Sequence, residues 1–201
     1  MSESDEVAAL RVDANAGDAH AQVLLGFAYD LGQDYSQAVL WYRKAADQGD
    51  AVAQRRLGDA YLYGEGVPQD DTQAMSWYRK AADQGDASVQ FYLGYAYADG
   101  RGVPQDKAQA MLWYRKSAEQ GYAGAQFNLG AMYVNGDGIP QDYVEAYKWR
   151  NLAASRASAA KQKEYADARD TVAKDMTPQQ LADAQTLAHE WVVAFEQRGG
   201  K

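Results

Sequence analysis

The chain has 201 residues, no cysteine and only two histidines, His20 and His189. Without cysteine there is no disulfide framework, no thiol nucleophile and no cysteine-ligated metal or haem. The two histidines lie far apart in the sequence, and each is interpreted as a solvated helix residue. We therefore predict no metal site and no cofactor.

Long apolar runs and clusters of basic residues are also missing. No segment approaches the roughly 18 consecutive apolar residues of a membrane-spanning helix. The formal net charge of −8 disfavours nucleic acid and anionic membranes, because both bind through clustered Lys and Arg. These absences predict a basic or neutral protein or peptide partner, with no nucleic acid and no membrane.

The first six residues, MSESDE, lack the basic and apolar regions of a secretory signal. Two expectations for the compartment follow: a cytoplasmic protein, or a periplasmic or secreted one whose signal has been removed. The absence of cysteine does not choose between them.

What the chain does contain is a repeat. Its tryptophans at Trp41, Trp77, Trp113 and Trp149 are each separated by 77 − 41 = 113 − 77 = 149 − 113 = 36 residues. Such a period indicates units that bury their apolar faces only by stacking. We predict one elongated array, with a cap helix over 1–17, four repeats over 18–49, 50–85, 86–121 and 122–155, and capping helices with a frayed tail over 156–201.

Each repeat reads as two helices. In the first helix Leu25, Gly26 and Tyr29 recur in every copy at a spacing of i, i+1 and i+4, which places them on one buried face. Glycine inside a helix costs about 1 kcal/mol relative to alanine, so its recurrence predicts a close approach of a neighbouring helix. The first helices are expected to end with a left-handed glycine, at Gly32, Gly64, Gly100 and Gly136.

The second helix has its own recurring signals. Its predicted start is an aspartate followed three residues later by Gln or Glu, a capping-box pattern, at Asp34, Asp70, Asp106 and Asp142. It is expected to pack through Ala38, Trp41 and Ala45 and their equivalents. It should end at Gly49, Gly85 or Gly121, after which Asp50 and Asp86 cap the next helix.

The two ends of the array differ from its middle. Residues 2–16 read as an orphan second helix, and residues 156–174 as a polar helix. Thr177 and Pro178 open a further helix to about residue 197. Trp191 is expected to pack this last helix against the array.

The run A-Q-x-x-L-G-x-x-Y-x-x-G-x-G-V-P-Q-D-x-x-x-A-x-x-W-Y-R-K-A-A-x-Q-G, carried almost whole by residues 53–85, resembles the Sel-one-like repeat family, which is related to tetratricopeptide repeats. The match covers residues 18–155, and the C-terminal segment 176–191 resembles the closing helix of bacterial members. The departures are a shortened first turn, Tyr122 in place of a capping aspartate, and Arg150 where Tyr42, Tyr78 and Tyr114 stand.

This resemblance implies an all-α fold, a right-handed α-solenoid of helix-turn-helix repeats with capping helices, whose first helices line a concave groove. It implies a non-catalytic scaffold or adaptor that binds a protein or peptide. Some secreted members with paired cysteines have been linked to cell-wall-type small molecules, but this chain lacks cysteine. Two alternatives stay open: a protein that binds, and possibly hydrolyses, cell-wall fragments or other small molecules, and a structural spacer or self-associating module. A monomer, with weak self-association as an alternative, is expected.

Positions that repeat are expected to serve stacking, and those that differ along the first helices are the candidates for binding. At the offsets that face the groove in tetratricopeptide-like arrays, these candidates are His20, Val23, Phe27, Asp30, Arg55, Asp59, Tyr63, Phe91, Tyr95, Asp99, Phe127, Ala131 and Asn135. They combine aromatic residues with an arginine, types enriched at binding hot spots. An alternative is that Phe91 and Phe127 only fill space between adjacent first helices.

Other patterns favour structural roles. Asp70, Asp106 and Asp142 lie a repeat apart and cap helices, so we predict no catalytic residues. The segment 135–138 suggests a calcium loop, but its twelfth position is Ala146 and not the glutamate of an EF-hand. The Gly-x-Gly pairs lack the Lys-Ser/Thr of a phosphate loop. The Arg-Lys pairs at 43–44, 79–80 and 115–116 are interpreted as a solvated outer face, with a basic stripe that meets an acidic partner as the alternative.

Overall fold

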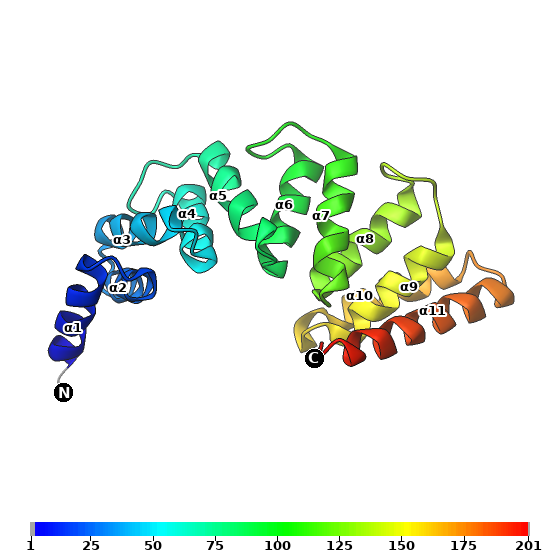
Figure 1. Ribbon diagram of the computed structural model, residues 1–201. Coiled ribbons are helices and arrows are strands. Elements are labelled where there is room, and N and C mark those ends of the chain that lie inside the picture. The colour runs from blue at the N-terminus through cyan, green and yellow to red at the C-terminus, as the bar shows by residue number, and fades with distance from the viewer. Residues whose placement is uncertain (1–2, 201) are drawn as a thin grey trace. The chain divides into compact units, whose positions relative to one another are not determined.

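A computed structural model describes residues 3–200 of the chain, and within that range the regular structure is entirely helical (Figure 1). The eleven helices are α1 (Glu3–Asn15), α2 (Ala19–Leu31), α3 (Tyr35–Asp47), α4 (Ala51–Tyr63), α5 (Asp71–Asp83), α6 (Ala87–Asp99), α7 (Lys107–Glu119), α8 (Ala123–Asn135), α9 (Tyr143–Arg156), α10 (Ala159–Ala173) and α11 (Pro178–Gln197). The all-α repeat fold is thereby confirmed. The first two residues of the expected cap and Lys201 of the expected frayed tail lie outside the described residues.

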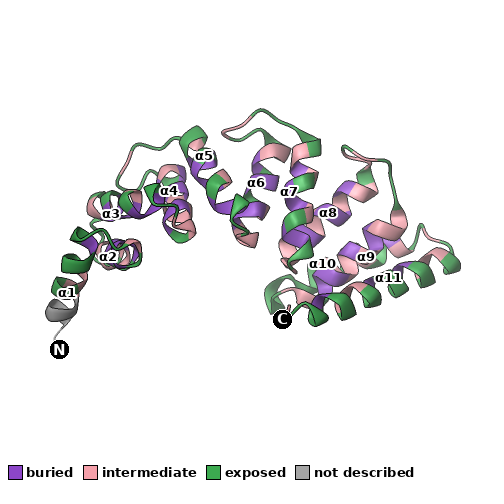
Figure 2. Ribbon diagram, in the orientation of Figure 1, coloured by how far each residue is buried: buried purple, intermediate pink, exposed green. Residues whose placement is uncertain are grey.

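The helices divide between two compact units. The first unit comprises Met1–Val89 with Arg101–Val103, and the second comprises Gln90–Gly100 with Pro104–Lys201. Each unit has its own buried clusters along the facing sides of its helices (Figure 2). The four repeating tryptophans, the leucines of the Leu-Gly pairs and the repeating alanines of the second helices are buried, as their recurrence predicts.

The helix-interior glycines exist because a tyrosine occupies their side-chain space. A Cβ atom on Gly26 or Gly58 would overlap the ring of Tyr42 or Tyr78, which comes from the second helix of the same repeat. Gly94 stands in the same relation to Tyr114. In the fourth repeat the place of the tyrosine is taken by Arg150, whose Cγ lies 2.8 Å from the ideal Cβ position of Gly130. The predicted close approach of the paired helices is confirmed.

The ends of the first helices follow the prediction in all but the first repeat. Gly64, Gly100 and Gly136 have φ of 73°, 76° and 71°, the left-handed conformation that glycine favours. Gly32 has φ −79°, and Gln33 is the left-handed residue, with φ 58°. The turn of the first repeat is four residues shorter than the turns of the other repeats. In this shorter turn the left-handed residue is the one that follows the glycine.

The capping aspartates make one of the two hydrogen bonds of the predicted capping box. Asp34, Asp70, Asp106 and Asp142 each accept a hydrogen bond from the backbone N–H three residues on. In a capping box the Gln or Glu side chain also accepts a hydrogen bond from the N–H of the capping residue. Here that N–H donates instead to the carbonyl of a first-helix tyrosine, as the Asp70 N–H does to Tyr61 at 2.9 Å. The prediction of four complete capping boxes is therefore wrong, because only the hydrogen bond to the aspartate side chain forms. A complete box joins Thr177 and Gln180 at the start of α11.

The arginine of the Arg-Lys pairs is not merely solvated, contrary to the prediction. Arg43 donates to the Tyr61 hydroxyl at 2.6 Å, and Arg115 donates to the Tyr133 hydroxyl at 2.6 Å, so each ties one repeat to the next. The lysine of each pair lies over a tryptophan ring, Lys44 at 3.8 Å from Trp41 and Lys116 at 4.1 Å from Trp113. The arginines therefore link consecutive repeats, and the lysines lie over tryptophan rings of the second helices.

The C-terminal helices close the second unit. The Trp191 ring of α11 lies edge-on to Trp149 of α9 at 6.0 Å and stacks on Phe195 at 4.8 Å. This confirms that Trp191 packs the last helix against the repeats.

Candidate binding surfaces

In the first unit, the candidates on α2 and α4 fall into exposed and packed groups. His20 and Tyr63 are exposed, Tyr63 by 63%. Arg55 is partly exposed and lies 3.9 Å from the Asp86 carboxylate. Val23 is only 4% exposed and packs in the core with Leu57. A partner has no access to Val23, so the surface proposed below leaves it out.

Asp30 and Asp59 are partly buried acceptors for the tyrosines that cross the helix-interior glycines. The Tyr42 hydroxyl donates to Asp30 at 2.5 Å, and the Tyr78 hydroxyl donates to Asp59 at 2.6 Å. Burial raises the pKa of Asp59 above its ordinary value, although the hydrogen bond from Tyr78 opposes this effect. Burial, reinforced by the bond to Asp30, also raises the pKa of Tyr42. These carboxylates therefore have a structural partner.

One set of equivalent first-helix positions is missing from the candidates predicted from the sequence. The position before each Leu-Gly pair holds Leu24, Arg56, Tyr92 and Asn128, which differ between repeats as binding residues should. The Arg56 guanidinium lies 4.8 Å from the centre of the Phe27 ring, which is half-buried against the core and 5.7 Å from the ring of Tyr42. The criterion of non-repetition, applied to every offset, would have found it.

The register of the first repeat also needs a correction. Counted from the Leu-Gly pairs, the equivalent of Tyr63, Asp99 and Asn135 is Leu31, which is 87% exposed. Asp30 is equivalent to the buried Leu62. Leu31 therefore takes the surface position that the sequence analysis assigned to Asp30.

In the second unit, α6 presents the most aromatic surface. Tyr92 and Tyr95 are 43% and 46% exposed, and Asp99 is exposed one turn further along the same face. Phe91 is half-buried, with its ring centre 5.1 Å from that of Tyr122 and 5.8 Å from that of Tyr114. Burial raises the pKa of Tyr114 to about 12, with a smaller opposite effect from its hydrogen bond to Asn128.

The candidates on α8 are divided in the same way. Phe127 stacks on Tyr165 of α10 at 4.2 Å, and Arg150 lies 5.6 Å from its ring centre. Ala131 is partly exposed, and Asn135 is exposed and donates to Asp137 at 3.3 Å. Phe91 and Phe127 are thus each half-buried against a neighbouring aromatic ring, and both the packing and the binding interpretation of these two residues stay predictions.

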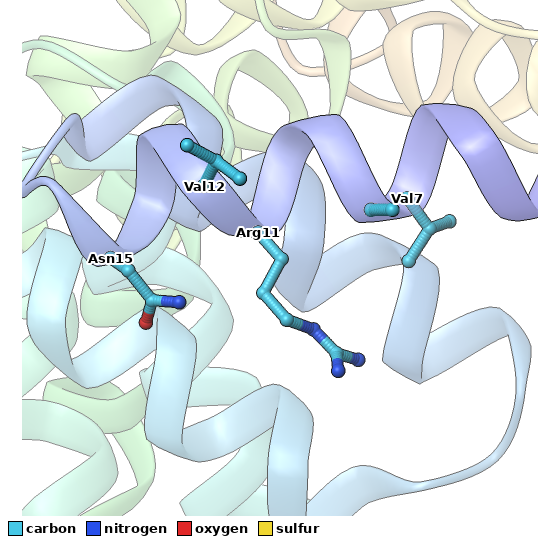
Figure 3. Close-up of a pocket in the computed structure, with 5 residues that line it drawn as sticks. Val7, Arg11, Val12 and Asn15 are labelled. Atoms are coloured by element: carbon cyan, nitrogen blue, oxygen red, sulfur yellow. The ribbon is translucent and has the colours of Figure 1, made fainter.

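A cavity of about 540 Å³ opens in the second unit beside these aromatic residues. Its wall is formed by Phe91 of α6, the turn before α8, and the segment that joins α9 to α10, with Arg156, Lys161 and Tyr165. A smaller cavity of about 300 Å³ in the first unit lies along α1, where Val7, Arg11 and Asn15 project from one side of the helix (Figure 3). Arg11 there donates to the Tyr29 hydroxyl at 2.7 Å, which ties α1 to α2.

The described residues contain no group of three or more His, Asp or Glu side chains arranged to hold a metal ion. His20 and His189 are both exposed, on α2 and α11. Asp137 of the segment 135–138 pairs with Lys107, and the hydrogen bond from that lysine lowers the pKa of Asp137. Among helices of residues 3–200, none combines the length and apolar character needed to cross a bilayer.

Comparison with known proteins gives a consistent result. The Sel1 repeat model matches residues 19–50, 51–86, 87–122 and 123–158. The structure resembles a protective antigen of uropathogenic Escherichia coli strains that displays an SLR fold, with 36% identity and a TM-score of 0.78 over 92% of this chain and 40% of that chain. It also resembles a Sel1 repeat protein from Oxalobacter formigenes, with 35% identity and a TM-score of 0.70 over 76% of this chain and 64% of that chain. No curated protein matches.

The chain thus spans less than two thirds of the length of either solved structure. The repeat period, the paired helices and the family match agree over residues 19–158. The chain belongs to the Sel1 repeat family, whose members generally mediate protein–protein interactions.

Proposed function

We propose that this protein is a non-catalytic adaptor that binds a protein or peptide segment through the first helices of its repeats. The observation that carries the proposal is the contrast between two kinds of position. Residues that repeat are buried or bonded between helices, while the residues that differ on α2, α4, α6 and α8 include exposed aromatic and charged side chains.

The exposed tyrosines are the strongest part of this contrast. Tyr63, Tyr92 and Tyr95 expose between 43% and 63% of their surface, although each carries an apolar ring. Tyrosine supplies a large contact area at a low cost in conformational entropy and is enriched at hot spots. Arg55 adds a charged group that remains partly exposed despite its contact with Asp86.

The alternative of a hydrolase has less support from the titratable groups. In active sites, perturbed pKa values arise where acid and base groups converge in a pocket. Here the raised pKa values of Asp59 and Tyr42 accompany hydrogen bonds between the paired helices of a repeat, and that of Tyr114 accompanies burial beside Asn128 of the next repeat. Their shifts follow from the scaffold and need no substrate.

The test is affinity capture from lysate of the source cell with the immobilised chain and its Arg55→Ala/Tyr95→Ala variant. We expect the native chain to retain a partner that the variant loses. The matched control is Leu40→Ala/Leu112→Ala, because these leucines are 52% and 44% exposed on second helices of the same two units. A partner that binds the first variant as well as the native chain, or that only the control variant loses, would remove the proposed site.

A further inference from the structure

We propose that the cavity of the second unit binds an acidic peptide segment, in which a carboxylate lies beside an aromatic or large apolar side chain. This inference deepens the proposed function and rests on it. It depends on three local departures from the repeat, at residues 122, 156 and 158, which all fall on the wall of this cavity.

The first departure is Arg156, which stands where a repeating glutamine is expected. Gln48, Gln84 and Gln120 each donate to a first-helix glutamine, Gln22, Gln54 and Gln90, at 2.8 Å. The equivalent of these donors in the next repeat is Arg156, counted as 120 + 36. Its guanidinium turns away, and the Oε1 atom of the fully buried Gln126 is left without a hydrogen-bond partner.

The Arg156 guanidinium is instead held between the cavity and two aromatic rings. It lies 4.9 Å from the ring centre of Trp191 and 4.7 Å from that of Phe195. It forms no ion pair with a carboxylate among residues 3–200, and Glu196 acts on it only at longer range. Burial lowers the pKa of Arg156, because desolvation disfavours its charge. A carboxylate from a partner would offset that desolvation.

The second and third departures remove negative charge from two helix starts. At the corresponding starts of α2, α4 and α6, the carboxylates of Asp18, Asp50 and Asp86 accept from backbone N–H groups. Tyr122 and Ser158 replace them at α8 and α10, and neither side chain makes a capping hydrogen bond. Both helix starts line the cavity, so their positive ends add to the charge of Arg156.

The rest of the wall suits an apolar side chain next to the carboxylate. Phe91, Tyr122 and Tyr165 contribute aromatic surface, and Lys161 adds a second cation, although it also pairs with Glu164 at 2.7 Å. No acidic residue is among the described residues of the wall. A volume of about 540 Å³ falls in the range of ligand sites, and a lone small anion would leave its aromatic part unfilled.

A local preference for an acidic segment is compatible with the net charge of −8. Charges at the surface are screened beyond about 8–10 Å at physiological ionic strength. The groups that touch the bound segment therefore decide the preference, and here those groups are cationic or helix N-termini.

The test is selection of random displayed dodecapeptides on the immobilised full chain, followed by titration of the most enriched peptide in solution. We expect enriched sequences to place Asp or Glu beside an aromatic residue. Converting those acids to Asn or Gln should weaken binding at least about tenfold, the effect of losing a charge-assisted hydrogen bond. Equal binding of the amide version would overturn the proposal, and so would selection that yields no such sequences.

Three variants separate the site from general stability and charge. Arg156→Gln restores the repeating glutamine and Ser158→Asp restores the capping carboxylate, so neither should lower the thermal midpoint, and both should weaken binding of the acidic peptide at least about tenfold. Lys163→Gln removes a charge from α10 at a residue that is not part of the wall, and it should leave affinity unchanged.

The variants also separate this inference from the proposed function. If the peptide binds Arg156→Gln as tightly as the native chain but is lost on Arg55→Ala/Tyr95→Ala, the cavity assignment is overturned and the proposed function stands. If lysate capture yields no partner while the acidic peptide binds through Arg156, the proposed function fails and the cavity remains a peptide site.

Discussion

Gly58 shows how a single missing side chain allows two helices to pair. Its ideal Cβ would overlap the buried ring of Tyr78. Alanine gains about 1 kcal/mol in helix propensity over glycine, but overpacking a well-packed core costs about 1–3 kcal/mol. Because the ring of Tyr78 is rigid and 1% exposed, we expect Gly58→Ala to lower the free energy of unfolding by about 1–2 kcal/mol in denaturant titrations.

Gly130 supplies the matched control for this substitution. Its ideal Cβ lies 2.8 Å from the Cγ of Arg150 and 3.1 Å from the Ala146 carbonyl oxygen, whereas that of Gly58 lies 2.3 Å from two ring atoms of Tyr78. Gly130→Ala should therefore be the milder of the two changes. Equal losses for both variants would contradict the role assigned to the tyrosines.

Trp77 tests the prediction that the repeating tryptophans are core residues. It is 8% exposed and packs in the cluster that contains Tyr42 and Leu57. Trp77→Ala should cost about 3–5 kcal/mol through the cavity it leaves. Thermal unfolding measures this loss, and a melting temperature unchanged within error would refute the assignment.

The buried carboxylate of Asp59 predicts a pH-dependent effect. Its folded-state pKa is raised mainly by burial, so the contribution of Asp59 to stability is present below its unfolded pKa and is lost as pH rises through the folded value. Asp59→Asn removes the charge and keeps an oxygen to accept from Tyr78.

The variant should therefore be more stable than the native chain at neutral pH, and the difference should shrink below about pH 4, near the unfolded pKa of aspartate. Urea titrations at several pH values measure it. A difference that grows on acidification would contradict the sign of the shift.

Most of these residue roles could be predicted, because four copies in one chain separate positions that serve stacking from positions that do not. The reach of Tyr42, Tyr78 and Tyr114 over the glycines could not, since it depends on how closely the paired backbones approach. Arg150 departs from the repeating tyrosine in the sequence, but the smaller overlap that it makes at Gly130 follows only from the packing of the two helices.

Among the helices, α10 is the one whose start departs most clearly from the repeat. Ser158 precedes it without a capping hydrogen bond, whereas the equivalent Asp50 accepts from Ala53 N–H at 2.8 Å. Ser158→Asp should raise the free energy of unfolding by about 1–2 kcal/mol, through the cap and the helix dipole, and urea titrations measure the gain.

The control is Ser76→Asp, the same change at an exposed position in the middle of α5. It has no helix terminus to cap, so no stabilisation is expected. A gain for Ser76→Asp equal to that for Ser158→Asp would show that added charge, and not capping, is responsible.

Helix boundaries could be predicted from sequence because glycine, proline and aspartate mark them locally. The errors arose where a distant group competes for the same hydrogen bond. The cap N–H of Asp70 bonds to the carbonyl of Tyr61, which leaves Gln73 no partner there. Arg43 and Arg115 were assigned to solvent because their tyrosine partners lie 18 residues away and approach only when the helices stack.

For the molecule as a whole, each of the two units has buried clusters of its own. The binding surface was the least predictable feature. Tyr122 and Arg156 come from a turn and a helix end, and they join Phe91 at one cavity only through tertiary packing. The first-helix candidates stay predictions, from which Val23 drops out because it lies in the core, and Leu31 replaces Asp30 at the exposed position.

The claim at the centre of this account is that repeating positions hold the fold and unlike positions on the first helices recognise the partner. Hydrogen–deuterium exchange of the chain with and without its captured partner tests it most directly. We predict that binding slows exchange in α2, α4, α6 and α8 and leaves α3, α5 and α7 unchanged. Slowed exchange confined to those second helices would contradict the claim.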